Sequence, residues 1–262
     1  MNTIYFDNSA TTRISDEALE TYLEVSKNTF GNPSSLHALG FAAERELNAA
    51  RSAILRTLGS PVGTLIFTAS GSEANNLAIS GRLHAKERYR RGAKILTTAG
   101  EHASVSEPLR ALGAEGVKIV EIPTAGGVLD REALLREMTP DVVLVTMMLV
   151  NNETGALYDL ADVSRLMKEK LPEAVLHVDA TQGYLKVPFT PKSLGADMIT
   201  LSSHKIEGPK GVGALYVSSD LIKKRGLSAQ ILGGGQEGGL RSGTENVPGV
   251  AAFATRFIPP AF

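Results

Sequence analysis

Short runs of β-branched and other apolar residues alternate along this chain with stretches whose apolar positions recur every three or four residues. The first pattern is typical of buried strands, and the second is typical of helices with one apolar face. Because helical stretches separate the first several runs, the sequence predicts an α/β fold with a mostly parallel sheet flanked by helices. The predicted strands cover residues 64–68, 94–98, 117–122, 142–148, 175–179, 198–202 and 212–217.

The predicted helices have recognisable ends. Ser15 is suited to cap a helix that continues to about Lys27, with two acidic residues in its first turn. A second helix is predicted at residues 41–58, where Gly59 is suited to end it. The other predicted helices cover residues 72–87, 103–112, 130–138 and 159–171.

Composition and charge exclude several classes of protein. With 43% hydrophobic residues among 262, the chain can bury a large core and is not a disordered polyelectrolyte. Its 27 basic and 28 acidic residues give a net charge of −1, which argues against nucleic acid or an anionic membrane as a partner. Cysteine is absent, so these residues hold no disulfide, no thiolate metal site and no cysteine nucleophile.

The N-terminus has no signal-peptide pattern, because no apolar stretch follows it and the first basic residue is Arg13. The most apolar run, residues 142–150, has roughly half of the ~20 residues that a membrane-spanning helix needs. This run is therefore interpreted as a buried strand. We expect the protein to be cytoplasmic.

Polar side chains follow five consecutive predicted strands. In an open α/β sheet, ligands bind outside the carboxyl ends of the strands, in the loops that lead to the helices. These loops carry hydroxyl, amide, imidazole, carboxylate and amine groups, which indicates a shared binding site. The segments concerned are Ala69–Glu73, Ala99–His102, Val150–Glu153, Asp179–Gln182 and Ser202–Lys205.

Three of these side chains have a chemical and a structural interpretation each. A desolvated Lys205 loses its proton easily and can form a Schiff base, whereas a lysine at a strand end can also be an ordinary surface residue. Asp179 can hold a pyridinium nitrogen protonated, or it can cap the next helix. Gln182 can donate to a phenolic oxygen, or it can be solvated.

The segment at Gly71 and Ser72 opens a predicted helix, and helix amides beside a glycine and a hydroxyl bind anions. A structural helix cap by Ser72 explains the same residues. Ser202 and His204 would add donors to the same anion. The ring of His102 can stack on a flat cofactor, or it can be buried and bonded to the backbone.

Competing motifs are absent from the sequence. His177 and Asp179 could suggest a metal pair, but without thiols or a spaced histidine pair we expect no metal site. No Gly-x-Gly-x-x-Gly turn, no Gly-x-Ser-x-Gly elbow and no P-loop occurs. Dinucleotide-binding, α/β-hydrolase and P-loop functions are therefore not indicated.

Taken in order, the motifs of this chain resemble those of cysteine desulfurases, which are pyridoxal-phosphate enzymes of the class V aminotransferase family. The resemblance runs from the first residues to about Ala254. It rests on motifs within Tyr5–Thr12, Gly31–His37, Phe67–Glu73, Glu101–His102, Asn151–Gly155, His177–Gln182, Ser203–Gly211 and Gly233–Thr244.

The resemblance implies the large domain of a fold-type I enzyme, with Lys205 and His102 as catalytic residues and Lys205 bound covalently to pyridoxal 5'-phosphate. It implies that Thr244 reaches the phosphate of the other subunit's cofactor, so a homodimer is expected. Residues 69–72 read Ala-Ser-Gly-Ser where several members carry Ser-Gly-Ala-Thr, and the hydroxyl is kept at Ser72. The implied cofactor-binding residues are Gly71, Ser72, His102, Asn152, Asp179, Gln182, Ser202, His204, Lys205 and Thr244.

Three segments follow from the same resemblance. Residues 1–14 are expected to form an N-terminal segment, residues 15–250 the pyridoxal-phosphate-binding large domain, and residues 251–262 the truncated start of a C-terminal domain. Family members are longer, and their C-terminal domain carries the nucleophilic cysteine and an arginine for the substrate carboxylate. Two prolines in the last residues are consistent with a premature stop or a reading-frame change, and also with a short natural protein.

The implied function is that of a sulfurtransferase, a cysteine desulfurase-like protein without its nucleophilic cysteine. Such an enzyme removes sulfur from L-cysteine, gives alanine, and passes the sulfur to an acceptor or scaffold protein for iron–sulfur cluster assembly. Two alternatives stay open at this point. One is another pyridoxal-phosphate lyase or aminotransferase of the family, and the other is a non-catalytic fragment.

Overall fold

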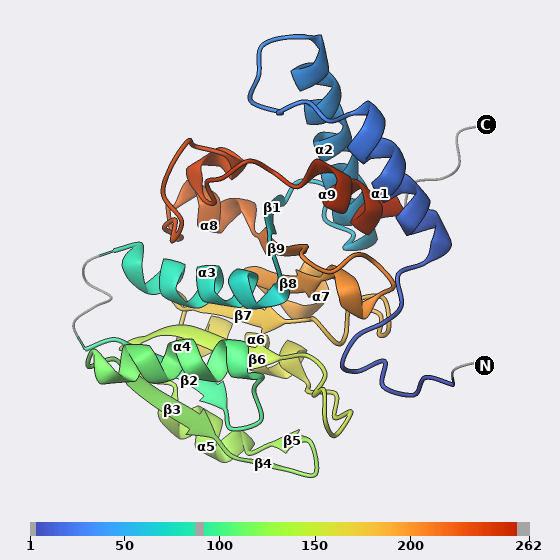
Figure 1. The fold of residues 1–262 in the computed structure, drawn as a ribbon. Helices are drawn as coiled ribbons and strands as arrows, with labels where there is room; N and C mark the ends of the chain where they lie inside the picture. Colours follow the sequence, from blue (N-terminus) through green and yellow to red (C-terminus); the bar gives the residue numbers. More distant parts are fainter. Residues whose placement is uncertain (1–3, 87–91, 256–262) are drawn as a thin grey trace.

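A twisted sheet forms the centre of the computed structural model, which describes residues 4–86 and 92–255 (Figure 1). Within these residues the sheet has seven strands in the order β1-β9-β8-β7-β6-β2-β3. All seven predicted strands are confirmed, and only two of them begin one residue later than expected. Their bounds are β1 Thr64–Thr68, β2 Lys94–Thr98, β3 Lys118–Ile122, β6 Val142–Met148, β7 Val175–Asp179, β8 Met198–Ser202 and β9 Gly213–Val217.

Most of the sheet is parallel, as predicted. Strands β3, β2, β6, β7 and β8 pair in parallel, whereas β9 runs antiparallel to both of its neighbours, β8 and β1. The connection between β8 and β9 is too short for a crossover helix, which explains the reversal. A small hairpin of β4 (Thr124–Ala125) and β5 (Val128–Leu129) was not predicted.

The six predicted helices are confirmed, with shifts at their ends. Ser15 caps the first of them, because its Oγ accepts a 3.2 Å hydrogen bond from the backbone nitrogen of Ala18. Residue 87 of one predicted helix lies outside the described residues. The helices are α1 Asp16–Asn28, α2 Ala38–Thr57, α3 Gly71–His84, α4 Ala103–Ala114, α5 Arg131–Glu137 and α6 Leu160–Lys170, followed by α7 Pro191–Leu194, α8 Ser219–Lys223 and α9 Val247–Ala254.

Helices cover both faces of the sheet, and the alternation of strand side chains explains why. Ile66 and Leu144 face the side on which α3 and α4 lie next to each other (Figure 1). Leu65 and Val145, one position away, belong to the core on the opposite face, which α2 and α6 help to form. Strands β2, β7, β8 and β9 are therefore buried on both faces, and β1 and β6 nearly so, whereas the edge strand β3 keeps exposed residues.

Two peripheral segments pack against this body. The N-terminal segment crosses the end of β8, where the backbone nitrogens of Thr12 and Ser15 donate to the carbonyls of His204 and Glu207 over 2.9 Å each. Helix α9 packs on α1 and α2, and it contains the predicted domain boundary after Val250.

Residues 1–3 and 256–262 of the predicted terminal segments lie outside the described residues, and the division into three segments stays a prediction. No helix of the described part of the chain is long and apolar enough to cross a membrane.

Candidate active site

A cavity of about 560 Å³ opens at the carboxyl ends of β6, β7 and β8. Its walls are built by the loops that follow these strands, by the start of α3 and by the N-terminal segment. The structure thus brings together the polar side chains that the sequence placed at separate strand ends. Nearly all predicted site residues line the cavity: Gly71, Ser72, His102, Asn152, Asp179, Gln182, Ser202, His204 and Lys205.

Thr244 is the exception among the predicted site residues. It is exposed and does not line this cavity. Its expected role is to reach a second subunit's cofactor, so a position outside the cavity of its own subunit agrees with that expectation without testing it. The role stays a prediction.

Lys205 and Asp179 share the cavity. Nζ of Lys205 donates hydrogen bonds to the backbone carbonyls of Ser9 and, over 2.8 Å, Ala10. Burial lowers the pKa of Lys205, while the charges of Asp179 and Asp7 act in the opposite direction. The amine is therefore easier to deprotonate than that of a surface lysine, as a nucleophile or base requires.

The carboxylate of Asp179 is buried and held from two sides. Oδ1 accepts a hydrogen bond of 2.9 Å from the backbone nitrogen of Thr181, and Oδ2 accepts one of 2.8 Å from Nδ2 of Asn75. The carboxylate therefore forms a turn with residue 181 instead of capping a helix. It presents a fixed negative group to the cavity.

His177, two positions before Asp179 on β7, is a core residue and not part of the site. It is fully buried between the hydroxyls of Thr146 (2.8 Å) and Thr200 (3.0 Å). Burial lowers the pKa of His177 to about 4, against the charge of Asp179, so the ring is neutral at neutral pH. Among the described residues, no group of three His, Asp or Glu side chains is arranged to hold a metal ion.

His102 caps α4 and faces the cavity. Its Nδ1 accepts a hydrogen bond of 3.1 Å from the backbone nitrogen of Ser104 and lies 2.8 Å from the hydroxyl of the same residue. The ring is thus bonded to the backbone, as the structural alternative expected, but it is exposed and not buried. An exposed ring held at one nitrogen leaves a flat face free for stacking.

The start of α3 differs in one detail from the sequence-based interpretation. The helix cap is Ser70, whose Oγ accepts a hydrogen bond of 3.1 Å from the backbone nitrogen of Glu73, so the interpretation of Ser72 as the cap is wrong. Both serines flank Gly71, and the position of the backbone decides whether the helix begins after Ser70 or after Ser72. Ser72 is left exposed at the cavity wall.

Gly71 is at a point of close approach. A Cβ on this residue would lie 3.1 Å from Cβ of Ser202 and 3.2 Å from Oγ1 of Thr181. Opposite it, Nδ1 of His204 lies 3.0 Å from Oγ1 of Thr11, and burial followed by the charge of Lys205 lowers the pKa of His204. A larger residue at position 71 would therefore crowd Ser202 and Thr181, which line the cavity together with His204.

Gln182 and Asn152 also line the cavity. Nε2 of Gln182 donates to the carbonyl of Ser9 over 2.8 Å. Asn152 reaches the cavity because its neighbour Asn151 is buried and holds the loop, with Oδ1 accepting a 2.8 Å hydrogen bond from the backbone nitrogen of Thr154.

The sequence did not single out several side chains that shape this cavity. Ser104 and Thr181 follow predicted site residues by two positions, and their spacing to His102 and Asp179 was the available signal. Asn75 lies one turn inside α3 and gave no signal in the sequence. Asn75, Ser104 and Met148 were missed, whereas Ser70, Val150, Glu153 and Thr181 lie in the predicted segments but were given no individual role.

The fold and the cavity define a class of protein. A mostly parallel sheet that carries a lysine, a carboxylate and a helix start at the carboxyl ends of its strands is typical of α/β proteins that bind a phosphorylated ligand there. The family model described as "Aminotransferase class-V" matches residues 4–257, and the chain belongs to this family.

Curated relatives in the family are named cysteine desulfurases. The cysteine desulfurase of Trichormus azollae is 38% identical over 256 residues, which is 97% of this chain and 61% of the relative. Cysteine desulfurase IscS 1 of Archaeoglobus fulgidus is 38% identical over 252 residues, 95% of this chain and 63% of the relative. The chain thus spans about three fifths of the length of the curated relatives it matches.

Solved structures support the fold. A structure described as "NIFS-LIKE PROTEIN" superposes with a TM-score of 0.91 at 37% identity, covering 97% of this chain and 68% of that one. A structure described as "SspA in complex with cysteine" has a TM-score of 0.88 at 33% identity, covering 98% of this chain and 73% of that one. The large-domain fold expected from the sequence is confirmed.

Proposed function

We propose that residues 1–262 bind pyridoxal 5'-phosphate through Lys205 and act on the Cα of L-cysteine. The observation that carries this proposal is the shared cavity of Lys205 and Asp179. Its volume of about 560 Å³ lies within the range of roughly 300–1,000 Å³ that small-molecule sites occupy. The part of the cavity lined by Ser70, Gly71, Ser72 and Ser202, at the start of α3, suits a phosphate group.

Each residue would have a defined task. Gly71, Ser72, Ser202 and His204 would bind the phosphate, and Asn152 and Gln182 would lie beside the ring and the substrate. The ring of His102 would pack over the flat cofactor. Bound in this way, pyridoxal phosphate supplies an electron sink for the electron pair left when the Cα proton of an amino acid is removed.

Two residues would handle the protons. Asp179 would hold a proton at the pyridine nitrogen, because Thr181 and Asn75 keep its carboxylate in place. Lys205 would take the Cα proton at Nζ, for which its lowered pKa prepares it. Before that, the amine must leave the carbonyls of Ser9 and Ala10 that it contacts.

The proposed substrate rests on the relatives. Curated relatives carry the name cysteine desulfurase, and one similar structure is described as a complex with cysteine. In such a reaction a thiolate takes the sulfur of L-cysteine and alanine is left. Residues 1–262 contain no cysteine, so the accepting thiol has to be supplied from outside these residues.

The proposal includes a homodimer, which the exposed Thr244 supports because it lies outside the cavity of its own subunit. It also includes an acceptor or scaffold protein that receives the sulfur for iron–sulfur cluster assembly, in keeping with the names of the relatives. The cytoplasmic location expected from the sequence stays a prediction.

Covalent trapping tests the proposal. Purified protein is mixed with pyridoxal phosphate, its visible spectrum is recorded, and the adduct is reduced with borohydride and located by peptide mass spectrometry. We expect one adduct, on Lys205, that is lost in Lys205→Ala and kept in Lys210→Ala, an exposed lysine nearby. An adduct that persists in Lys205→Ala would contradict the proposal.

A second assay measures turnover of L-cysteine. With an added thiol we expect alanine to form from L-cysteine, and without the thiol we expect no sulfide release above that of free cofactor.

A further inference from the structure

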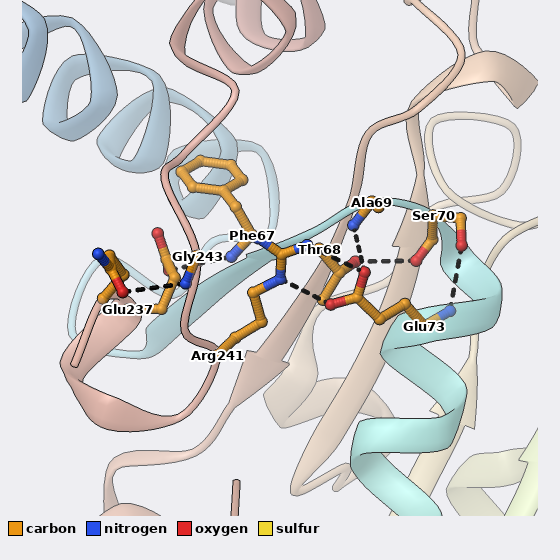
Figure 2. A network of polar contacts seen from close by, with 9 residues as sticks. Phe67, Thr68, Ala69, Ser70, Glu73, Glu237, Arg241 and Gly243 are labelled. Carbon is orange, nitrogen blue, oxygen red and sulfur yellow. Dashed lines mark hydrogen bonds and ion pairs between the residues drawn. The ribbon is translucent and has the colours of Figure 1, made fainter. Parts of the chain in front are cut away.

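A salt bridge links the start of α3 to a loop far away in the sequence. Nε of Arg241 donates to Oε1 of Glu73 over 2.7 Å, and Nη2 of Arg241 lies 3.3 Å from Oε2 of Glu73 (Figure 2). Each of the two side chains is only 20% exposed. Figure 2 shows the guanidinium of Arg241 pointing directly at the carboxylate, in the paired geometry that arginine and carboxylates favour.

Glu73 also shapes the turn that precedes α3. Its Oε2 accepts a hydrogen bond of 2.8 Å from the backbone nitrogen of Ala69, and its own backbone nitrogen donates to Oγ of Ser70 over 3.1 Å (Figure 2). The turn held in this way is residues 69–72, and its members Ser70, Gly71 and Ser72 line the cavity. A change at Glu73 therefore acts on the part of the site that would hold a phosphate.

The charge of Glu73 favours the start of α3 but is unfavourable for a phosphate bound at the same place. The start of a helix attracts anions, and a carboxylate in the first turn competes with a bound phosphate and repels it. Arg241 removes this conflict, because its fixed positive charge pairs with Glu73. The other carboxylate of the loop, Glu237, is engaged with Arg51 over 2.8 Å, so it does not draw Arg241 away from Glu73.

We propose that Arg241 is a positioning residue for the phosphate of the cofactor, acting through Glu73. It fixes the turn at residues 69–72 and cancels the negative charge that Glu73 brings to the phosphate site. This inference rests on the proposed function, because it concerns the same cofactor. It predicts that the carboxylate of Glu73 is harmful to phosphate binding only when Arg241 is absent.

Three variants test this dependence: Arg241→Gln, Glu73→Gln and the double variant. We expect Arg241→Gln to raise the dissociation constant for pyridoxal phosphate by about tenfold, since the carboxylate of Glu73 is then left without its cation next to the turn that would hold the phosphate. Glu73→Gln should change it by less than about threefold, because an amide oxygen still accepts the hydrogen bond from Ala69. The double variant should bind pyridoxal phosphate about as well as Glu73→Gln. Removing the carboxylate of Glu73 would then restore the affinity that is lost when Arg241 is replaced.

Pyridoxal, which has no phosphate, is the control ligand, and its affinity should be the same in all four proteins. Arg165→Gln is the control variant, because Arg165 forms an exposed pair with Glu169 on α6 that lies outside the cavity. The inference is overturned if the double variant binds pyridoxal phosphate no better than Arg241→Gln, or if pyridoxal binding falls in parallel. Failure of the proposed function gives a different result, namely no adduct on Lys205 in the unmodified protein.

Discussion

Nδ2 of Asn75 donates a hydrogen bond of 2.8 Å to Oδ2 of Asp179, although the two residues are 104 positions apart. The same nitrogen donates to Oγ of Ser104 over 2.8 Å, and Ser104 in turn contacts His102. A carboxylate only accepts hydrogen bonds, so Asp179 fixes the amide nitrogen of Asn75 on its own side. Oδ1 of Asn75 is left buried with no hydrogen-bond partner among the described residues, which agrees with that orientation.

Asn75→Asp tests this contact. The substitution replaces a donor by a second buried carboxylate, so we expect the free energy of unfolding to fall by about 2–4 kcal/mol at pH 7.5. The loss should shrink at pH 5, because two close carboxylates can share one proton. Urea unfolding at both pH values measures it. Asn76→Asp is the control, since Asn76 is the exposed neighbour on the same helix and should change stability by less than about 0.5 kcal/mol. Equal effects at both positions would contradict the assignment.

Glu101 is a buried carboxyl bonded to Met148, a residue that lines the cavity. Its Oε1 accepts hydrogen bonds from Oγ1 of Thr98 (2.7 Å) and from the backbone nitrogen of Met148 (3.0 Å), and its Oε2 is buried without a partner among the described residues. Burial raises the pKa of Glu101 from 4.5 to about 8, against these hydrogen bonds. The folded protein thus keeps a proton that the unfolded chain releases.

The free energy of unfolding therefore contains a contribution from Glu101 that falls as the pH rises from 4.5 to about 8. The slope reaches about −1.4 kcal/mol per pH unit within this window. Glu101→Gln keeps the accepting oxygen but has no proton to lose, so its stability advantage over the unmodified protein should grow with pH. Urea unfolding of both proteins at pH 5, 6, 7 and 8 measures this difference. The exposed Glu115→Gln should show no such trend, and parallel pH profiles for Glu101→Gln and the unmodified protein would disprove the prediction.

Gly71→Ala should separate binding from stability. The added Cβ would lie 3.1 Å from Cβ of Ser202 and would displace this residue of the proposed phosphate site, so we expect the affinity for pyridoxal phosphate to fall by about tenfold or more. The unfolding temperature should change little, because alanine is a better helix former than glycine and offsets the crowding. Gly113→Ala in α4, where a Cβ would be 3.5 Å from Ile119, should raise stability slightly and leave binding unchanged. Unchanged cofactor affinity in Gly71→Ala would place the phosphate elsewhere.

The central fold could be predicted because its signals are local. All five residues of β7 are buried, so Val175–Asp179 is apolar except for His177 and ends in a carboxylate. Ser15 and Gly59 mark helix ends through contacts with residues only a few positions away. The hairpin at residues 124–129 has no such signal, because Val128 is 69% exposed and an exposed strand has no apolar face to bury.

The parts of the site that the sequence did not predict depend on contacts between distant segments. Asn75 becomes a partner of Asp179 only when α3 lies across the end of β7. Arg241 meets Glu73 across 168 positions, and no spacing in the sequence reveals the pair. The choice of Ser70 over Ser72 as the cap of α3 is equally a matter of backbone position, since both are serines beside the same glycine.

Glu237 fixes the glycine-rich loop to the edge of the sheet. Its side chain is 2% exposed and accepts hydrogen bonds from both terminal nitrogens of Arg51, at 2.8 and 2.9 Å, and from the backbone nitrogen of Phe67, at 3.0 Å. The guanidinium of Arg51 also lies 4.7 Å from the centre of the Phe67 ring. Glu237 keeps its contacts with Arg51 and Phe67 at a backbone φ of 52°, a conformation that non-glycine residues rarely adopt.

We expect Glu237→Ala to lower the free energy of unfolding by about 2–4 kcal/mol, because it removes the carboxylate that pairs with Arg51 and the acceptor of the Phe67 amide. Arg51→Met should lower the free energy of unfolding by less than Glu237→Ala does. Adding Arg51→Met to Glu237→Ala should lower it almost no further, since the guanidinium that lost its carboxylate is then gone. A double-mutant cycle from urea unfolding measures the coupling, expected at about 1–3 kcal/mol. Strictly additive costs would mean that the loop is held by its backbone contacts and not by this ion pair.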